Sequence, residues 1–432
     1  MPKPTRYTVA QHGMLPTPSP LKQAVKLLLV AIAVLLVATT SVGAFLLYDL
    51  SSTYKGRAVT LEDQPTPPAS DQPAAGSTYT AMTGGVNVLL VGTDICEASY
   101  AQELGKRCTG PQANYTSANN DVNVLLHISD NPRRVTVISF PRDMIIPTPS
   151  CERPDGGTAP ATSASMLNST YSYGGLSCVA KTISALTGIG IPYAASITFG
   201  GVINVTDAIG GVQVCVANGI DDPYTHLHLS PGMHTVKGLE ALQFLRTRHG
   251  LVAGSDLARI SNQQQYMSRL VRQLVDGGEL SNPVTLYKLA SALVRNITPS
   301  DTLTDPATLV RIALAVKSVP FDQIVMLQYP TVADPHNANR VLPNTDAAAV
   351  LFTALKANKQ LKITSLESPG YGVVPQVTTG GPSPSPSGSG SGSGSGSASP
   401  SPSATPGDEV ALPSTISGTT AADNTCANGN RR

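Results

Sequence analysis

Residues 121–143, DVNVLLHISDNPRRVTVISFPRD, decide the fold of this chain. They contain two apolar runs, at 122–128 and 134–140, of the length and composition that buried strands have. The five residues between them, Ser-Asp-Asn-Pro-Arg, are typical of a tight turn. A third apolar run, VNVLLVGTD at 86–94, comes before them. We predict that the three runs form an antiparallel meander.

The ends of these strands carry charged side chains. In such a meander Asp94 follows the first strand, Asp121 precedes the second and Arg142 follows the third, so all three lie at one rim of the sheet. Ligands commonly bind at strand ends in sheets of this kind. Each aspartate alone is equally typical of the start of a turn. The convergence of the three is therefore the functional signal.

The rest of the region between about 83 and 370 alternates strands with helices. Strands are predicted at 212–216 and 323–329. Helices are predicted at about 177–187, 200–209, 237–244 and 256–276, with later ones beginning near Pro283, Pro306 and Thr345. This order predicts an α/β (α+β) fold with a mixed central β-sheet flanked by helices.

A second group of polar residues lies in FLRTRHGLVAGSDLARISNQQQYM, residues 244–267. Arg246 and Arg248 share a face if the segment is extended there. Asp256, Arg259 and Gln263 follow i, i+3, i+7 spacing and share one helix face. Guanidinium groups suit phosphate oxygens, so the cluster favours an anionic ligand, although a solvated helix with an Asp–Arg pair has the same pattern.

The N-terminal part predicts a membrane anchor. Residues 27–48, LLLVAIAVLLVATTSVGAFLLY, carry no charge and reach about 33 Å as a helix, enough to cross a bilayer core. Lys and Arg but no Asp or Glu precede them, which predicts a single-pass protein of the cell membrane with residues 1–26 cytoplasmic and the rest extracellular. The alternative is a signal peptide cleaved near Val42-Gly43-Ala44.

The biased segments set the remaining boundaries. Residues 49–82 are predicted to be an extracellular linker, 83–370 the main domain with its core at 84–276, and 371–432 a disordered tail. The last rests on residues 380–407, which are almost wholly Gly, Ser and Pro and cannot bury apolar area. The net charge is +1, so no basic face points to nucleic acid.

The six cysteines all follow the apolar stretch, on the side where disulfides persist. Cys96–Cys108 is the first expected pair. Spacing does not choose among Cys151, Cys178 and Cys215, and Cys426, in the predicted tail, is a candidate for a free thiol. No CxxC, HExxH, GxSxG, P-loop or GxGxxG motif is present. The HxH of His226 and His228 is interpreted as surface histidines.

Several motifs in one order resemble the LytR–CpsA–Psr family of cell-envelope proteins. They are VLLVGTD at 88–94, DVNVLLHIS at 121–129, ISFPRDM at 138–144, LNSTYSYGG at 167–175, DAIGGVQV at 207–214, ALQFLRTRH at 241–249 and DLARISNQQQ at 256–265. The resemblance covers roughly residues 84–276. The short N-terminus, single anchor and outer domain are also similar to that family.

The resemblance implies a phosphotransferase that moves a glycopolymer from a polyprenyl-pyrophosphate carrier onto peptidoglycan. It implies Mg²⁺ bound by Asp94 and Asp121, and diphosphate contacts from Arg142, Arg246, Arg248 and Arg259, supported by Asp256 and Gln263. One departure is Asn119, where members commonly have Arg. The general base is not assigned, and Asp256 and Asp143 are both candidates.

Two other functions are possible alternatives, and the first of them shares the binding site with the transferase. One is a non-catalytic polyprenyl-phosphate-binding or sensory envelope protein, and sequence separates it poorly from the transferase. The other is a membrane-bound transcriptional regulator or attenuator, and a cytoplasmic segment of 26 residues is too short for a helix-turn-helix.

Overall fold

The computed structural model describes residues 52–67, 81–110, 118–276, 283–365, 372–376 and 408–431. The predicted cytoplasmic segment (1–26) and transmembrane helix (27–48) lie outside these ranges. Within them, no helix combines the length and the apolar character needed to cross a bilayer. The fold below is that of the compact unit Thr53–Arg432.

A seven-stranded mixed sheet forms the centre, in the order β13-β8-β1-β2-β3-β14-β20. The strands are β1 (Val86–Thr93), β2 (Asn120–Ile128), β3 (Val135–Phe140), β8 (Tyr193–Ile197), β13 (Ile297–Pro299), β14 (Ile324–Gln328) and β20 (Gly418–Thr420). The predicted meander is confirmed, since β1, β2 and β3 pair antiparallel. Parallel pairing of β8 with β1 and of β14 with β3 makes the sheet mixed.

The helices begin and end at the residues that local chemistry indicates. They are α2 (Lys106–Thr109), α3 (Thr170–Thr187), α4 (Phe199–Ala208), α5 (Gly238–Arg246), α6 (Asp256–Asp276), α7 (Pro283–Asn296), α8 (Pro306–Lys317) and α9 (Thr345–Lys356). The Ser255 hydroxyl accepts from the Ala258 amide and caps α6, as predicted. Helix α3 starts earlier than the predicted residue 177, because a kink at Gly174-Gly175 joins a short preceding turn to it.

Two apolar layers cover the two faces of the central sheet. Leu89 and Val91 point to one face and pack with α3 and α9. Val86 and Val88, which alternate with them, point to the other face, where α8 and part of α6 pack. Both faces are thus buried, which explains why these strands are nearly continuous apolar runs.

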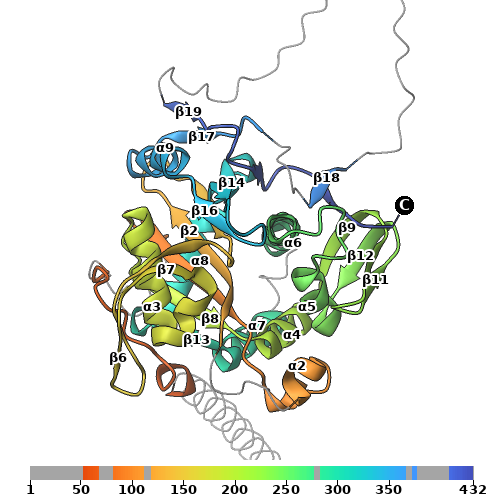
Figure 1. The fold of residues 1–432 in the computed structure, drawn as a ribbon, viewed down its shortest axis with the longest axis horizontal. Helices are drawn as coiled ribbons and strands as arrows, with labels where there is room; N and C mark the ends of the chain where they lie inside the picture. Colours follow the sequence, from red (N-terminus) through yellow and green to blue (C-terminus); the bar gives the residue numbers. More distant parts are fainter. Residues whose placement is uncertain are drawn as a thin grey trace, which may run out of the picture. The chain divides into compact units, whose positions relative to one another are not determined.

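A second sheet has the order β12-β9-β21-β18. Its strands are β9 (Val212–Asn218), β12 (Gly232–Val236), β18 (Val373–Pro375) and β21 (Thr425–Asn428). Helix α6 runs between this sheet and the central one (Figure 1). Two-stranded pairs complete the fold: β4 (Ile145–Thr148) with β7 (Thr162–Met166), β5 (Cys151–Glu152) with β6 (Thr158–Ala159), β10 (Ile220–Asp222) with β11 (Leu227–Leu229), β15 (Thr331–Ala333) with β16 (Val341–Pro343), and β17 (Gln360–Lys362) with β19 (Glu409–Ala411).

The prediction of a disordered tail at 371–432 is wrong for residues 372–376 and 408–431. Strand β20 extends the central sheet, and β21 is inserted between β9 and β18. Cys426, predicted as a candidate free thiol, forms a disulfide with Cys215. The short strands at 418–420 and 425–428 gain their pairing from partners about 90 and 210 residues earlier, which no local pattern reveals.

The other cysteines and the predicted linker are also ordered by partners far along the chain. The expected Cys96–Cys108 disulfide is confirmed, and Cys151 pairs with Cys178. Residues 52–67, predicted as part of an extended tether, pack on the domain instead. There Val59 bridges to Ser300, and Glu62 forms an ion pair of 3.2 Å with Lys181 of α3.

Candidate functional site

A β-bulge shapes the rim where the first two strands end. Gly92 pairs with Val122, but Thr93 pairs with Asn120, so Asp121 is the extra residue of β2. A bulge re-aims the side chain of the extra residue and is frequent beside functional sites. Gly92 permits the close approach, since a Cβ there would lie 2.9 Å from the Cβ of Val122. The backbone thus brings Asp121 to the rim as a buried carboxylate.

Asp94 lies next to Asp121 through the pairing of the same strands. Its amide donates to the Asn119 carbonyl at 3.1 Å. In return the Asn119 amide donates to Asp94 Oδ1 at 2.6 Å, and Asn119 Nδ2 lies 3.4 Å from Oδ2. Asn119, the departure from the family pattern, therefore orients the Asp94 carboxylate in this chain.

Arg142 and Arg259 join the two predicted groups of residues into one cluster. Arg142 follows β3, and its Nη1 lies 2.8 Å from Asp121 Oδ1. Its Nε lies 3.3 Å from Asp256 Oδ1, at the start of α6. Arg259 Nη2 contacts the same Asp256 oxygen at 2.7 Å and donates to the Asp121 carbonyl at 2.9 Å. Of the residues predicted to converge, the structure thus brings together Asp121 and Arg142 of the strand ends with Asp256 and Arg259 of the α6 face.

Two polar atoms at the centre of this cluster have neither a hydrogen bond nor an ion pair in the described part of the chain. They are Asp256 Oδ2 and Arg259 Nε, and both are buried. Asp256 Oδ1 and Arg142 Nε take part only in the ion pairs described above. Buried groups of this kind are rarely left unpaired in a finished structure. Their concentration here indicates a place where a polar ligand completes the network.

The charges of the cluster shift one another's pKa values. Burial alone would lower the pKa of Arg142, but the carboxylates of Asp121, Asp256 and Asp143 raise it overall. Burial raises the pKa of Asp143 despite the nearby guanidinium of Arg142. Arg142 is therefore a permanent cation, whereas Asp143 takes up a proton more readily than a surface aspartate.

A cleft of about 590 Å³ opens beside these residues. Its wall includes Arg142, Asp143 and Asp256, together with Arg248 from the loop after α5. Burial, and then the charge of Arg142, lower the pKa of Arg248. Among the described residues, no carboxylate lies within 4 Å of the Arg248 guanidinium. An anion bound in the cleft would supply a negative charge to pair with the Arg248 guanidinium.

Arg246 and Gln263, also predicted site residues, are placed differently. Arg246 does not line this cleft; its guanidinium lies over the Phe199 ring, 4.4 Å from the centroid. Phe199 follows β8, whose Ile197 pairs with Gly92 near the end of β1, so Arg246 belongs to the Asp94 end of the rim. Buried Gln263 donates to the Leu245 carbonyl at 2.8 Å and so holds the end of α5 that carries Arg246.

The carboxylates of the rim fit a magnesium ion that takes some of its ligands from the protein and the others from a substrate. Mg²⁺ is usually held by one or two carboxylates together with substrate phosphates. Asp94 and Asp121 are two buried carboxylates on adjoining strand ends, beside arginines suited to those phosphates. In the described ranges no group of three His, Cys, Asp or Glu side chains could hold a metal. His228, predicted to be a surface histidine, has a side chain that is 66% exposed.

Two further groups of residues at the site carried no signal in the sequence. Arg340, from the loop between β15 and β16, lines the cleft with its Nη1 3.4 Å from Asp143 Oδ1. The C-terminal residues 428–430 hold the loop that carries Arg248. The Val252 amide donates to the Asn428 carbonyl at 3.0 Å, and the Asn430 side chain donates to the His249 carbonyl at 2.9 Å.

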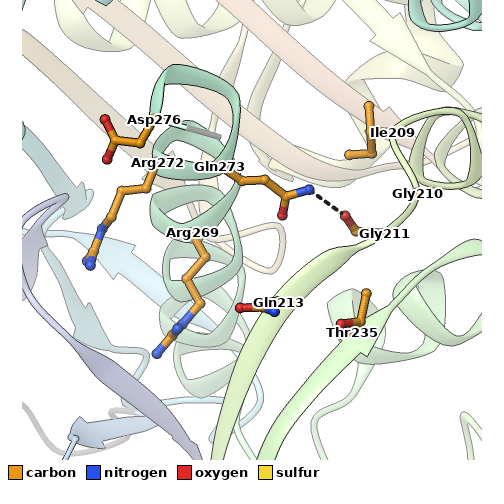
Figure 2. Close-up of a pocket in the computed structure, with 9 residues that line it drawn as sticks. All are labelled: Ile209, Gly210, Gly211, Gln213, Thr235, Arg269, Arg272, Gln273 and Asp276. Atoms are coloured by element: carbon orange, nitrogen blue, oxygen red, sulfur yellow. Dashed lines mark hydrogen bonds between the residues drawn. The ribbon is translucent and has the colours of Figure 1, made fainter. Parts of the chain in front are cut away.

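A second cleft of about 580 Å³ lies along the other half of α6, facing β9 and β12 (Figure 2). Arg269 and Arg272 line it, about 20–24 Å along the helix from Asp256 at 1.5 Å per residue. Both arginines fasten the C-terminal segment. Arg269 donates to the Thr425 carbonyl at 3.0 Å, and Arg272 donates to the Asp423 carbonyl and to Asn424 Oδ1. The two arginines of this cleft therefore have a structural role, since their hydrogen bonds hold the C-terminal segment in place.

These observations define a class of protein: an α/β domain with a cluster of Arg and Asp side chains at the ends of its sheet strands. The chain belongs to the LytR_cpsA_psr family, whose model matches residues 49–360. The fold resembles that of protein gbs0355 from Streptococcus agalactiae, with a TM-score of 0.51 and 18% identity over 63% of this chain and 87% of that one.

Relatives of the chain carry names from cell-wall assembly. It is 30% identical over 200 residues to the "probable cell wall biosynthesis protein LcpB" of Corynebacterium glutamicum, covering 46% of this chain and 44% of LcpB. It is 25% identical over 259 residues to the "polyisoprenyl-teichoic acid–peptidoglycan teichoic acid transferase TagT" of Bacillus subtilis, covering 58% of this chain and 70% of TagT. The chain spans less than half the length of LcpB.

Proposed function

We propose that this protein is a phosphotransferase of cell-wall assembly that moves a glycopolymer from a polyprenyl-pyrophosphate carrier onto peptidoglycan. The observation that carries the proposal is the cleft in which Arg142 and Arg248 meet Asp143 and Asp256 beside Arg259. Partly buried arginines, with the unpaired Nε of Arg259 beside them, suit a diphosphate. The name of TagT describes a transfer of this kind.

In the proposed reaction, a sugar hydroxyl of peptidoglycan attacks the phosphorus nearest the glycopolymer. The new P–O bond forms as the bond from that phosphorus to the bridging oxygen breaks, and polyprenyl phosphate leaves. Negative charge builds on the bridging oxygen, which leaves as part of polyprenyl phosphate. Arg142, Arg248 and Arg259 neutralise it from fixed positions, and this kind of positioning supplies most of the catalysis in phosphoryl transfer.

The hydroxyl proton needs an acceptor in the cleft. Asp143 lines the cleft, and burial raises its pKa toward the range in which a carboxylate is an effective base. Arg142 and Arg340, at 3.6 and 3.4 Å, keep its carboxylate oriented. We propose Asp143 as the general base. Asp256 acts instead as the carboxylate that holds Arg142 and Arg259 together.

We also propose that Asp94 and Asp121 hold Mg²⁺ when the carrier is bound, and that Arg246 and Gln263 contribute to carrier binding at that end of the rim. The ion would supply further charge neutralisation for the diphosphate. Residues 27–48 are proposed to anchor the protein in the cell membrane with the domain outside, because a lipid-linked donor and peptidoglycan would then meet at the membrane surface.

The test is a transfer assay with the full-length protein, a polyprenyl-pyrophosphate glycan and a peptidoglycan acceptor, with and without Mg²⁺. Arg142→Ala and Arg248→Ala should each weaken carrier binding about 10- to 150-fold, since a hydrogen bond to a charged group is worth about 1.5–3 kcal/mol. Arg153→Ala is the matched control, because Arg153 is exposed on the β5–β6 turn. Carrier binding without any transfer in the presence of Mg²⁺ would favour the non-catalytic binding protein instead.

A further inference from the structure

A buried carboxylate ties a surface turn to the loop that carries Arg248. Asp222, at the end of β10, is fully buried. Its Oδ1 accepts from the amides of Tyr224 and Thr225 at 2.9 and 3.3 Å. Its Oδ2 accepts from the Thr247 hydroxyl at 2.6 Å and from the amides of Arg248 and Gly250, both at 3.2 Å.

These donors decide the ionisation of Asp222. Burial by itself would raise the pKa of this carboxyl, but hydrogen bonds from the Thr247 hydroxyl and from the Tyr224, Gly250 and Thr225 amides lower the pKa overall, so Asp222 is an anion in the folded protein. A buried anion with every lone pair engaged is a rigid junction. The turn between β10 and β11 and the 247–250 loop therefore hold a fixed position relative to each other.

An aromatic surface sits on this junction. The Tyr224 ring lies 4.3 Å from the His249 ring, centroid to centroid, with 39° between the planes. Tyr224 is 74% exposed and Val252 is 63% exposed, more than any other large apolar side chain in the part of the chain that the structure describes. Exposed apolar groups that are held rigidly beside a cleft commonly mark a contact surface for a ligand.

The aromatic surface adjoins the phosphate cleft along the backbone. Arg248, immediately before His249, lines the cleft, and so do Ala253 and Gly254, immediately after Val252. A ligand whose phosphate lies at Arg248 would extend its next chemical unit over this surface. For a glycopolymer carrier or a glycan acceptor, that unit is a sugar.

We propose that Tyr224 and His249 form a binding subsite for one pyranose ring, next to the diphosphate cleft; the proposal rests on the phosphotransferase function. A pyranose has an apolar face of C–H groups, which packs on an aromatic ring, and a rim of hydroxyls. The Tyr224 hydroxyl and the His249 ring nitrogens are polar groups at the edge of the surface and suit that rim. A polyprenyl chain has no such polar rim and would favour a buried groove.

The first experiment measures sugar binding without phosphate transfer. The probe is a soluble, phosphate-free N-acetylglucosaminyl–N-acetylmuramic acid fragment, added to the full-length protein and followed by saturation-transfer NMR. Tyr224→Ala should weaken binding about 3- to 10-fold, whereas Tyr224→Phe, which keeps the ring, should change it less than about 2-fold. The control is Met233→Ala on β12, which removes a 48% exposed apolar side chain elsewhere and should change nothing.

A second readout uses the absence of Trp from this chain. In Tyr224→Trp the new indole is the only one, so its fluorescence should respond to the saccharide fragment and not to inorganic pyrophosphate. Unchanged NMR binding in Tyr224→Ala would overturn the subsite. So would a Tyr224-dependent loss of binding toward a short-chain prenyl phosphate with sugar binding unaffected, because that result identifies a lipid contact.

The transfer assay then distinguishes the two sources of the sugar. If Tyr224→Ala raises the KM for the peptidoglycan acceptor alone, the acceptor sugar occupies the subsite. If Tyr224→Ala raises the KM for the lipid-linked donor alone, the donor sugar occupies it. The failure of the proposed function is a separate outcome. Absence of transfer by the unmodified protein, with Tyr224-dependent sugar binding intact, refutes the phosphotransferase and leaves the subsite standing.

Discussion

Replacing Cys215 and Cys426 by serine in the full-length chain should cost far more stability than removing another disulfide. The bond joins residues separated by 211 positions. In the chain-entropy description, opening a loop of this size lowers the free energy of unfolding by about 5.4 kcal/mol at 25 °C, slightly above the range of about 0–5 kcal/mol known for disulfides. For a domain of this size, that corresponds to a fall in Tm of roughly 10 °C.

The matched comparison is the Cys96→Ser, Cys108→Ser variant. That disulfide closes a separation of 12 residues, for which the same relation gives about 2.8 kcal/mol. The variants remove the same atoms and differ mainly in loop length. The Cys215–Cys426 variant should therefore be the less stable of the two by about 2–3 kcal/mol in urea unfolding.

The same variant should also weaken the site. Cys426 lies in β21, directly before residues 428–430, which hold the loop of Arg248. Carrier binding should therefore fall in the Cys215–Cys426 variant at a temperature at which it is still folded. Equal unfolding free energies for the two variants would refute the argument from loop length, and unchanged carrier binding would refute the coupling to the site.

Three other predictions concern single residues. Burial lowers the pKa of His127 to about 4, below its usual value of 6.5, so its contribution to stability is complete above pH 6.5 and is lost as the pH falls toward 4. Urea unfolding should show a loss of about 1.8 kcal/mol from pH 7 to pH 5, and a His127→Gln variant in which that loss is not smaller would contradict this cause. A Cβ on Gly372 would lie 2.1 Å from the Ala258 carbonyl oxygen, so Gly372→Ala should destabilise by roughly 1–3 kcal/mol in thermal unfolding, more than Gly85→Ala, where the nearest atom is 3.4 Å away. Asp143→Asn should lower the transfer rate by roughly 10²- to 10⁴-fold while carrier binding, measured separately, is retained; full activity would exclude Asp143 as the base.

Much of the candidate site could be predicted because it depends on local patterns. Asp94 and Asp121 flank apolar runs whose alternation and turn fix an antiparallel pairing, and antiparallel neighbours bring such flanking residues to one edge. Asp256 and Arg259 lie three residues apart on a helix, so their contact follows from the helical repeat. The family resemblance implied that the two groups form one site, and the tertiary structure shows that they meet at Arg142.

Other site residues had no local signal. Asp222 precedes a turn, as many surface aspartates do, and only the approach of the 247–250 loop turns it into a buried junction with five donors. Arg340 comes from a loop almost 200 residues after Asp143. Such contacts depend on which loops the packed sheets bring together. No periodicity in a single sequence indicates which loops these are.

The sequence by itself determined the central meander, the helix boundaries at Ser255, Pro283 and Pro306, and the charged residues of the rim, because each follows from chemistry within a few neighbouring residues. The tertiary structure alone decided that the segment after the Gly/Ser/Pro tract folds back, that Cys426 pairs with Cys215, and that this segment holds the Arg248 loop. Strands as short as β20 and β21 have too few residues to specify their own pairing. Their stability comes from sheet edges formed by distant parts of the chain, and those edges exist only in the folded protein.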